Sequence, residues 1–327
     1  MRFATTIVLM FLGLLAGCNS APKQKPVVGV VPKGANHIFW QAVHAGANKA
    51  ASEYGLEVEW NAPTLEIDSS RQIAIVDSMV NRKLAGIALA PVDRAALVSV
   101  VERAAGMSIP VVIFDSDIDT RKRLTYVSTN NREGGRLAAG ELGRLMFAEG
   151  KVAIIGFMPG SASTMEREEG FRQELKAKFP KIQIVQTAYG MADRARAMAV
   201  TENILTAHPD LGGLFADNES SSAGMMQALK ARKTRKVRTV GFDSNDQLIQ
   251  DLQVRALDAM VLQDPFKMGY ESVKAIAMKL AGQQPPAEID SGVYLVGRLD
   301  MEKPDIVQLL RPDLSRWLSS AKPANSQ

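Results

Sequence analysis

The chain ends an apolar run twice with the same three residues. One segment is Val112-Ile113-Phe114-Asp115-Ser116, and the other is Val240-Gly241-Phe242-Asp243-Ser244. An Asp at the carboxyl end of a parallel strand lies in the crevice where open α/β sheets bind ligands. Two lobes that each offer such an Asp suggest a ligand held between them. The alternative is that each Asp only caps the next helix.

Short apolar runs alternate with helical patterns on both sides of these segments. The first helical pattern places Phe39, Ala42, Val43, Gly46 and Ala47 at spacings of three and four. Strands are expected at residues 27–31, 56–60, 86–89, 110–114, 151–157, 182–187, 212–216, 237–242 and 257–262. Such alternation is typical of βαβ units and parallel sheets, so we predict an α/β protein with two Rossmann-like lobes.

Length and composition agree with a soluble protein of two domains. The chain has 327 residues, 46% of them hydrophobic and 23% charged. Its formal net charge is +4, but the basic residues are scattered and form no Lys/Arg-rich block. We therefore expect no nucleic-acid surface.

The single cysteine stands at the end of an apparent export signal. Met1-Arg2 is followed by an apolar run at residues 7–15 and by Leu15-Ala16-Gly17-Cys18. The run is too short to span a membrane and fits a cleaved signal at residues 1–17. The ending resembles the bacterial lipobox, which predicts lipid on Cys18 and a polar tether at residues 18–26. The alternative is a plain secretion signal with an incidental Cys.

Several ordered segments together resemble one known family. They are Phe39-Trp40, Phe114-Asp115, Glu166 through Phe171, Leu205 through Asp210, Phe215-Ala216-Asp217-Asn218, Val240 through Asp243, and Gln263-Asp264-Pro265. In order and spacing the chain resembles the periplasmic sugar-binding proteins of ABC transporters, in particular the ribose-binding-protein-like group. That group shares the type I periplasmic binding fold with the effector domains of the lactose-repressor family.

The resemblance implies a domain division with three crossings between the lobes. They should fall near Thr129-Asn130, Gln263-Pro265 and Gly292-Val293. The N-terminal lobe would comprise residues 27–129 and 265–292, and the C-terminal lobe residues 130–264 and 293–318. Residues 319–327 would form a polar tail. The lobes of this family close on the ligand about the hinge.

The resemblance also assigns the ligand-binding residues, and their chemistry suits a sugar. A sugar ring has apolar C–H faces and an equator of hydroxyls, so its site needs aromatic walls and polar groups that donate and accept. Phe39 and Trp40 would stack on the ring, Asp115 and Asp243 would accept hydroxyl protons, and Arg167, Asn218 and Gln263 would donate. The lengthened loop at residues 32–36 brings Lys33 and His37 toward the mouth.

Each assignment has a structural alternative. Phe39 fits the apolar stripe of its helix and could be core, whereas Trp40 lies off the stripe and is the better wall. Arg167 could pair with Glu166 or Glu168 on a solvated face. Asn218 could only cap the next helix, and Gln263 could be plain hinge. The histidines His37, His44 and His208 are too separated to suggest a metal site.

Departures from the family pattern bear on the ligand. Ser116 stands where an Arg often follows the first Phe-Asp, Ala90 replaces an Asn, and Ala192 replaces an aromatic residue. These losses would enlarge or reshape the pocket and place ribose itself in doubt. We predict a larger or differently decorated sugar or polyol, and Lys33 and Arg167 could meet an anionic group on it.

The resulting prediction is a lipid-anchored solute-binding protein at the periplasmic or extracellular face. It would capture a sugar or polyol, deliver it to an ABC permease, act as a monomer, and need no cofactor or metal. The alternative is a ligand-sensing subunit for a membrane receptor or histidine kinase. A carbohydrate-active enzyme is a remote alternative, because the chain carries no catalytic motif such as Gly-x-Ser-x-Gly.

Overall fold

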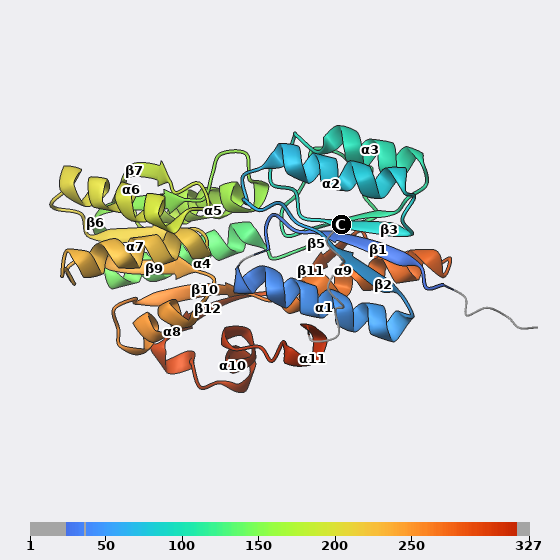
Figure 1. Ribbon diagram of the computed structural model, residues 1–327. Helices are drawn as coiled ribbons and strands as arrows, with labels where there is room; N and C mark the ends of the chain where they lie inside the picture. Colours follow the sequence, from blue (N-terminus) through green and yellow to red (C-terminus); the bar gives the residue numbers. More distant parts are fainter. Residues whose placement is uncertain (1–23, 36, 319–327) are drawn as a thin grey trace, which may run out of the picture.

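The computed structural model describes residues 24–35 and 37–318, and it divides them between two lobes (Figure 1). Each lobe is built on one six-stranded sheet. The strands of the first sheet are, in spatial order, β11 (Glu288–Asp290), β5 (Thr125–Ser128), β4 (Val111–Phe114), β3 (Gly86–Leu89), β1 (Val27–Val31) and β2 (Glu57–Trp60). All neighbours in this sheet are parallel.

The second sheet repeats this order with one change of direction. Its strands are, in spatial order, β12 (Val293–Gly297), β10 (Ala259–Gln263), β9 (Arg238–Phe242), β8 (Gly213–Ala216), β6 (Glu149–Gly156) and β7 (Lys181–Tyr189). Only the pairing of β10 with β12 is antiparallel. The predicted fold class, two α/β lobes with mostly parallel sheets, is confirmed.

Helices cover both faces of each sheet (Figure 1). Those of the first lobe are α1 (Ile38–Tyr54), α2 (Ser69–Asn81), α3 (Val98–Gly106) and α9 (Pro265–Leu280). Those of the second lobe are α4 (Asn131–Leu145), α5 (Ala162–Lys178), α6 (Arg194–Ala207), α7 (Glu219–Ala231) and α8 (Asp246–Gln253). Between the strands and helices lie separate apolar cores, two in each lobe.

The closest helix contacts depend on glycine. A Cβ on Gly46 of α1 would lie 1.9 Å from the carbonyl oxygen of Phe266 in α9. In the second lobe a Cβ on Gly135 of α4 would lie 1.9 Å from the carbonyl oxygen of Arg167 on α5. A side chain at either position would push the helices apart, so glycine is what lets the backbones approach. The contact at Gly135 therefore sets how close Arg167 on α5 lies to α4.

The chain passes from one sheet to the other three times. It crosses between β5 and α4, between β10 and α9, and between β11 and β12. Two of the crossing segments are tied together, because Thr129 Oγ1 lies 3.2 Å from Ser291 Oγ. Three parallel connections restrict the relative motion of the lobes to bending about the segment that holds them.

The last described residues rest on both lobes. After η1 (Arg298–Asp300), α10 (Pro304–Leu310) packs on the second lobe through Ile306 and Leu310. Leu314 and Trp317, the latter in α11 (Ser315–Leu318), then pack against α1 of the first lobe (Figure 1). This placement differs from the predicted division, which assigned residues 293–318 wholly to the C-terminal lobe. Leu314 and Trp317 pack on Ala42 and Ala45 of α1, which are buried beneath them.

Among the described residues, no helix is both long enough and apolar enough to cross a membrane. The predicted signal at residues 1–17, the lipidation site Cys18 and the polar tail at residues 319–327 lie outside the described residues.

Candidate ligand-binding site between the lobes

A small cavity lies between the lobes, at the carboxyl ends of the parallel strands. The structure brings all nine predicted residues to its wall: Lys33, His37, Phe39, Trp40, Asp115, Arg167, Asn218, Asp243 and Gln263. Glu66, Phe157, Ser163, Thr164, Glu219 and Ser220 complete the lining. Loops and helix starts of both lobes therefore contribute to one site.

Asp115 and Asp243 occupy equivalent positions in the two lobes. Each follows a central strand, and each has a left-handed backbone, with φ of 60° and 64°. The Asp115 N–H donates to the carbonyl oxygen of Val127, and the Asp243 N–H donates to that of Val261, on the neighbouring strands. The capping alternative is wrong, because the helices that follow are capped by Asn130 and Asn245. The left-handed turn instead directs both carboxylates into the cavity region.

The carboxylate of Asp243 is buried and hydrogen-bonded. Burial raises the pKa of the Asp243 carboxyl to about 6, although Arg167 and a hydrogen bond from Gln263 act in the opposite direction. Gln263 Nε2 donates to Asp243 Oδ1 over 2.7 Å. Gln263 therefore lines the cavity and orients the carboxylate, besides lying at the crossing between β10 and α9.

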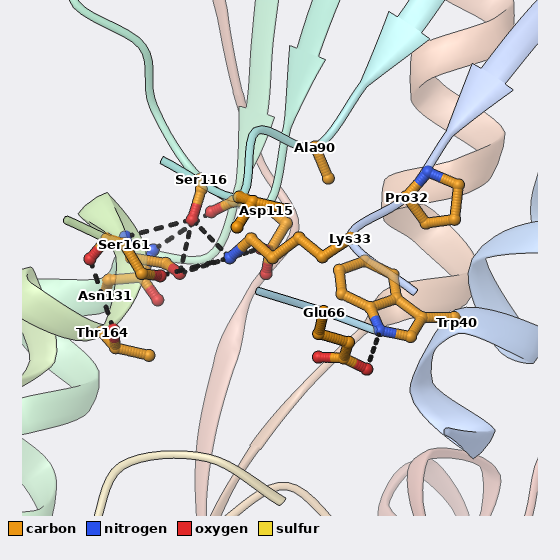
Figure 2. Close-up of polar contacts among 12 residues, drawn as sticks. Pro32, Lys33, Trp40, Glu66, Ala90, Asp115, Ser116, Asn131, Ser161 and Thr164 are labelled. Atoms are coloured by element: carbon orange, nitrogen blue, oxygen red, sulfur yellow. Dashed lines mark hydrogen bonds and ion pairs between the residues drawn. The ribbon is translucent and has the colours of Figure 1, made fainter. Parts of the chain in front are cut away.

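Lys33 lies inside the site and does not project as a free cation (Figure 2). Its Nζ is 2.7 Å from Asp115 Oδ2, and both side chains are 5% exposed. The same ammonium donates to Ser116 Oγ over 2.6 Å and to Ser163 Oγ, on the second lobe, over 3.3 Å. The charge of Lys33 is thus already balanced, and its donors already have acceptors on both lobes.

The two aromatic residues are placed the opposite way from the prediction. Trp40 is 4% exposed and belongs to the core of the first lobe, whereas Phe39 is only half-buried. The rings meet edge to face, with centroids 4.8 Å apart. Trp40 Nε1 donates to Glu66 Oε1 over 2.7 Å, which satisfies the buried indole (Figure 2). Phe39 is therefore the more open wall, and Trp40 supports it from behind.

Arg167 is buried at 2% exposure, so the alternative of a solvated helix face is wrong. Its Nε donates to Asn131 Oδ1 over 2.8 Å, and its guanidinium donates to the carbonyl oxygen of Asp217 over 2.8 Å. The guanidinium carbon lies 3.8 Å from the centroid of Phe242. Contacts with α4, with the end of β8 and with β9 fix the plane of this group, as a donor to a ligand requires.

Asn218 has both of the roles considered for it. Its Oδ1 accepts from the N–H of Ser221 and caps α7, while its Nδ2 donates to Ser220 Oγ. It also lines the cavity. The helix-capping alternative is therefore confirmed, and Asn218 lines the cavity as well.

His37 lies between carboxylates of different lobes. Its Nε2 is 3.3 Å from Glu66 Oε1, and its Nδ1 is 2.5 Å from Glu219 Oε2. Glu66 comes from the loop before α2, and Glu219 begins α7. Sequence reasoning missed both acids: Glu66 belongs to no predicted element, and Glu219 was considered only as the first residue of a helix.

The two alanines expected to reshape the pocket do not line it. Ala90 is fully buried in the first lobe, and its carbonyl oxygen accepts a hydrogen bond of 2.8 Å from Gln72 Nε2. Ala192 has a left-handed backbone and lies just before α6. The departures that do line the cavity are Lys33, which pairs with Asp115, and His37, which pairs with Glu66 and Glu219. Within the described residues, no group of three His, Cys, Asp or Glu side chains is arranged to hold a metal ion.

Two sheets of equal strand order, three crossings and a polar cavity between them define a two-lobed solute-binding protein of type I. The chain belongs to the periplasmic binding protein family, whose domain it matches over residues 28–284. Membership agrees with the predicted location outside the cytoplasm.

Two relatives of known function are sugar-binding proteins by name. The chain is 27% identical to the ribose import binding protein of Bacillus subtilis, over 90% of this chain and 99% of that one. It is 30% identical to the D-ribose/D-allose-binding protein of Pseudomonas aeruginosa, over 85% of this chain and 90% of that one. These relatives are transport proteins, which confirms the prediction that the chain is not an enzyme.

Solved structures agree over most of the chain. A carbohydrate transporter solute-binding protein of Agrobacterium radiobacter, in complex with D-arabinose, is 32% identical with a TM-score of 0.86, over 89% of this chain and 100% of that one. An ABC transporter solute-binding protein of Agrobacterium vitis with bound D-fucose is 33% identical with a TM-score of 0.84, over 87% of this chain and 100% of that one.

Proposed function

We propose that the protein captures a neutral monosaccharide or polyol between its lobes. The observation that carries this proposal is the set of nine lining residues, drawn from both lobes, around one cavity. Phe39 offers an aromatic face, Asp115 and Asp243 offer acceptors, and Arg167 and Asn218 offer donors. This is the combination that a polyhydroxylated ring requires. Relatives named for ribose and allose, and structures with D-arabinose and D-fucose, support the same class.

The charge pairing favours a neutral ligand over a sugar acid. Lys33, which was expected to meet an anionic group, is paired with Asp115. Glu66, Glu219 and Asp243 add further acids to the wall. A carboxylate on the ligand would enter a site rich in acids, where Arg167 is the only basic residue, among the described residues of the lining, that has no ion pair with an acid. We therefore withdraw the expectation of an anionic decoration.

Capture would work by closure of the lobes. Ser116 Oγ, on the first lobe, donates to Ser163 Oγ over 2.7 Å, and the Arg94 N–H donates to the carbonyl oxygen of Gly160. These bonds are available only when the lobes meet. A ligand that contacts both lobes adds its own bonds to the closed state and so shifts the population toward it.

Delivery to an ABC permease and anchoring through lipid on Cys18 are the remaining parts of the proposal. The relatives are binding proteins of import systems, which supports delivery. The Leu15-Ala16-Gly17-Cys18 segment supports the anchor. Intact-mass analysis of membrane-extracted protein tests the anchor. Lipid on Cys18 would raise the mass of the wild-type protein by that of the acyl chains, and the Cys18→Ser variant should lack this increase.

A thermal-shift screen tests the ligand class. The protein from Asn19 onward would be mixed with pentoses, hexoses, polyols and sugar acids, and a bound ligand raises the melting temperature. We expect a shift with at least one neutral sugar and its loss in Asp115→Asn and Arg167→Lys. Asp210→Asn, in a surface pair with Lys151, is the matched control that should keep the shift. Shifts confined to sugar acids would contradict the proposal.

A further inference from the structure

The ring of His37 is held between two carboxylates, one on each lobe. The contact to Glu66 lies within the first lobe, and the contact of 2.5 Å to Glu219 crosses to the second. The side chains of His37, Glu66 and Glu219 are 18%, 13% and 5% exposed. This is a buried three-residue bridge at the edge of the binding cavity.

The geometry calls for a doubly protonated ring. A neutral imidazole carries one N–H and one lone pair, so only one of its nitrogens can donate. Here both nitrogens face carboxylate oxygens. In the neutral ring one nitrogen would hold a lone pair beside a negative oxygen, whereas the imidazolium carries a proton on each nitrogen and a positive charge that the two carboxylates balance.

The groups around His37 act in the same direction. Burial by itself lowers the pKa of His37, but the close contact with Glu219 and the negative charges of Glu66 and Glu219 raise it by more. Arg194, which is 2.6 Å from Glu219 Oε1, is the one opposing cation among the groups that act on the ring. The net result is a pKa above the ordinary value of histidine.

Opening of the lobes removes only one side of the bridge. Glu66 stays with His37 because both belong to the first lobe, while Glu219 leaves with α7. The closed state therefore binds the proton more tightly than the open state. By linkage, the proton stabilises closure fully at low pH, and this contribution disappears as the pH rises through the pKa of the closed state.

We propose that His37 is a positioning residue of the binding site, which joins Glu66 and Glu219 across the lobes and makes capture weaker when its ring is neutral. Both of its nitrogens lie within 3.3 Å of carboxylate oxygens, so it acts through the two acids and not as a direct ligand contact. Where a sugar is the probe, this inference rests on the proposed function. Its conformational part does not.

The conformational part is tested without any sugar. The protein from Asn19 onward contains no cysteine, so spin labels can be attached through Ser52→Cys on α1 and Asn203→Cys on α6, which are both exposed. The distance distribution between the labels would be measured at pH 6.0 and pH 8.5. We expect longer distances to gain population at pH 8.5, and we expect no such change when His37→Asn is added.

The binding part uses D-arabinose as the probe, with its Kd measured by calorimetry at the same two pH values. We expect about a three- to tenfold weaker Kd at pH 8.5. In His37→Asn and in Glu219→Gln the change should be less than about twofold, because neither variant retains an imidazolium held by two carboxylates. Melting temperatures identify any variant that fails to fold, and the other variant then decides the outcome.

His44→Asn is the matched control, on α1, the helix that His37 precedes. His44 stacks on Trp60, and burial lowers its pKa to about 4, so it stays neutral over the whole range. This variant should retain the pH dependence of the wild type. The inference is overturned if His37→Asn keeps the wild-type dependence, or if the wild-type label distances do not change with pH. Absence of D-arabinose binding at both pH values would count against that ligand, and the label distances alone would then decide on His37.

Discussion

Lys33 Nζ and Asp115 Oδ2 lie 2.7 Å apart at the centre of the site, with both side chains 5% exposed. The pair joins the loop after β1 to the loop after β4, and the same ammonium reaches Ser161 and Ser163 on the second lobe. One buried cation thus orients the carboxylate that we propose as an acceptor for the ligand, and it also links the lobes.

Replacement of Lys33 by Met should leave Asp115 buried without its partner. Removal of one member of a buried pair costs about 3–5 kcal/mol, so the free energy of unfolding should fall by that order. Replacement of both members, Lys33→Met with Asp115→Asn, should cost less than the single change. Urea denaturation at pH 7 measures all three proteins. A loss below about 1 kcal/mol for Lys33→Met would show that the pair contributes little.

Gly135→Ala should move Arg167 without changing any polar group. The new Cβ would lie 1.9 Å from the carbonyl oxygen of Arg167, so α4 and α5 must separate. We expect a loss of about 1–3 kcal/mol in stability together with weaker sugar binding.

Gly140→Ala is the control for this change. Gly140 lies on α4 as well, and a Cβ there would meet nothing within 4 Å. Ala at this position should stabilise the helix by about 0.5–1 kcal/mol. Denaturation and calorimetry should separate the two variants. Equal behaviour would mean that the close approach of α4 and α5 does not position Arg167.

Asp243→Asn should stabilise the fold at neutral pH while weakening binding. The folded-state pKa of Asp243 is about 6, above its ordinary value of 3.8, so burial of the charged form costs stability above pH 6. That cost fades as the pH falls through 6 and is gone below 3.8. The shift corresponds to about 3 kcal/mol as an upper limit.

Thermal melts of Asp243→Asn and wild type at pH 4 and pH 7.5 test this sign. The advantage of the variant should be larger at pH 7.5. A variant that is less stable than wild type at pH 7.5 would show that the carboxylate of Asp243 is needed for folding.

Leu314→Ala tests the contact of the C-terminal segment with the first lobe. Leu314 is 7% exposed and packs on Ala42 and Ala45 of α1. Its truncation should cost about 2 kcal/mol. Leu299→Ala is the control, because Leu299 is 87% exposed and its loss should be nearly neutral. Equal melting temperatures for the two variants would contradict the packing of Leu314 on α1.

The lobes and most of the site could be predicted from the sequence because both depend on strand ends. A run of β-branched residues predicts a buried strand, and the residue that follows the strand lies in the crevice at the carboxyl edge of the sheet. That reasoning brought Asp115 and Asp243 together although they are far apart in the chain. It failed for β5, β11 and β12, which are short or only partly buried and lie beside the crossings.

Side-chain partners were harder to predict. The helical stripe placed Phe39 inside and Trp40 outside, but the start of α1 turns the larger ring onto the core, where Glu66 satisfies its N–H. Lys33 was expected to be free because its acidic partner, Asp115, lies 82 positions further on. Contacts between loops of separate units leave no periodic signal, so Glu66 and Glu219 could not be found by pattern.

Calorimetric titration of the protein from Asn19 onward tests the central claim most directly. Neutral pentoses and hexoses would be compared with the matching sugar acids at pH 7, in wild type and in Arg167→Lys. We predict tight one-to-one binding of a neutral sugar, weaker by about 1.5–3 kcal/mol in the variant because the orientation of the guanidinium donor is lost. Binding of a sugar acid in preference to every neutral sugar, or binding unaffected by Arg167→Lys, would contradict the account.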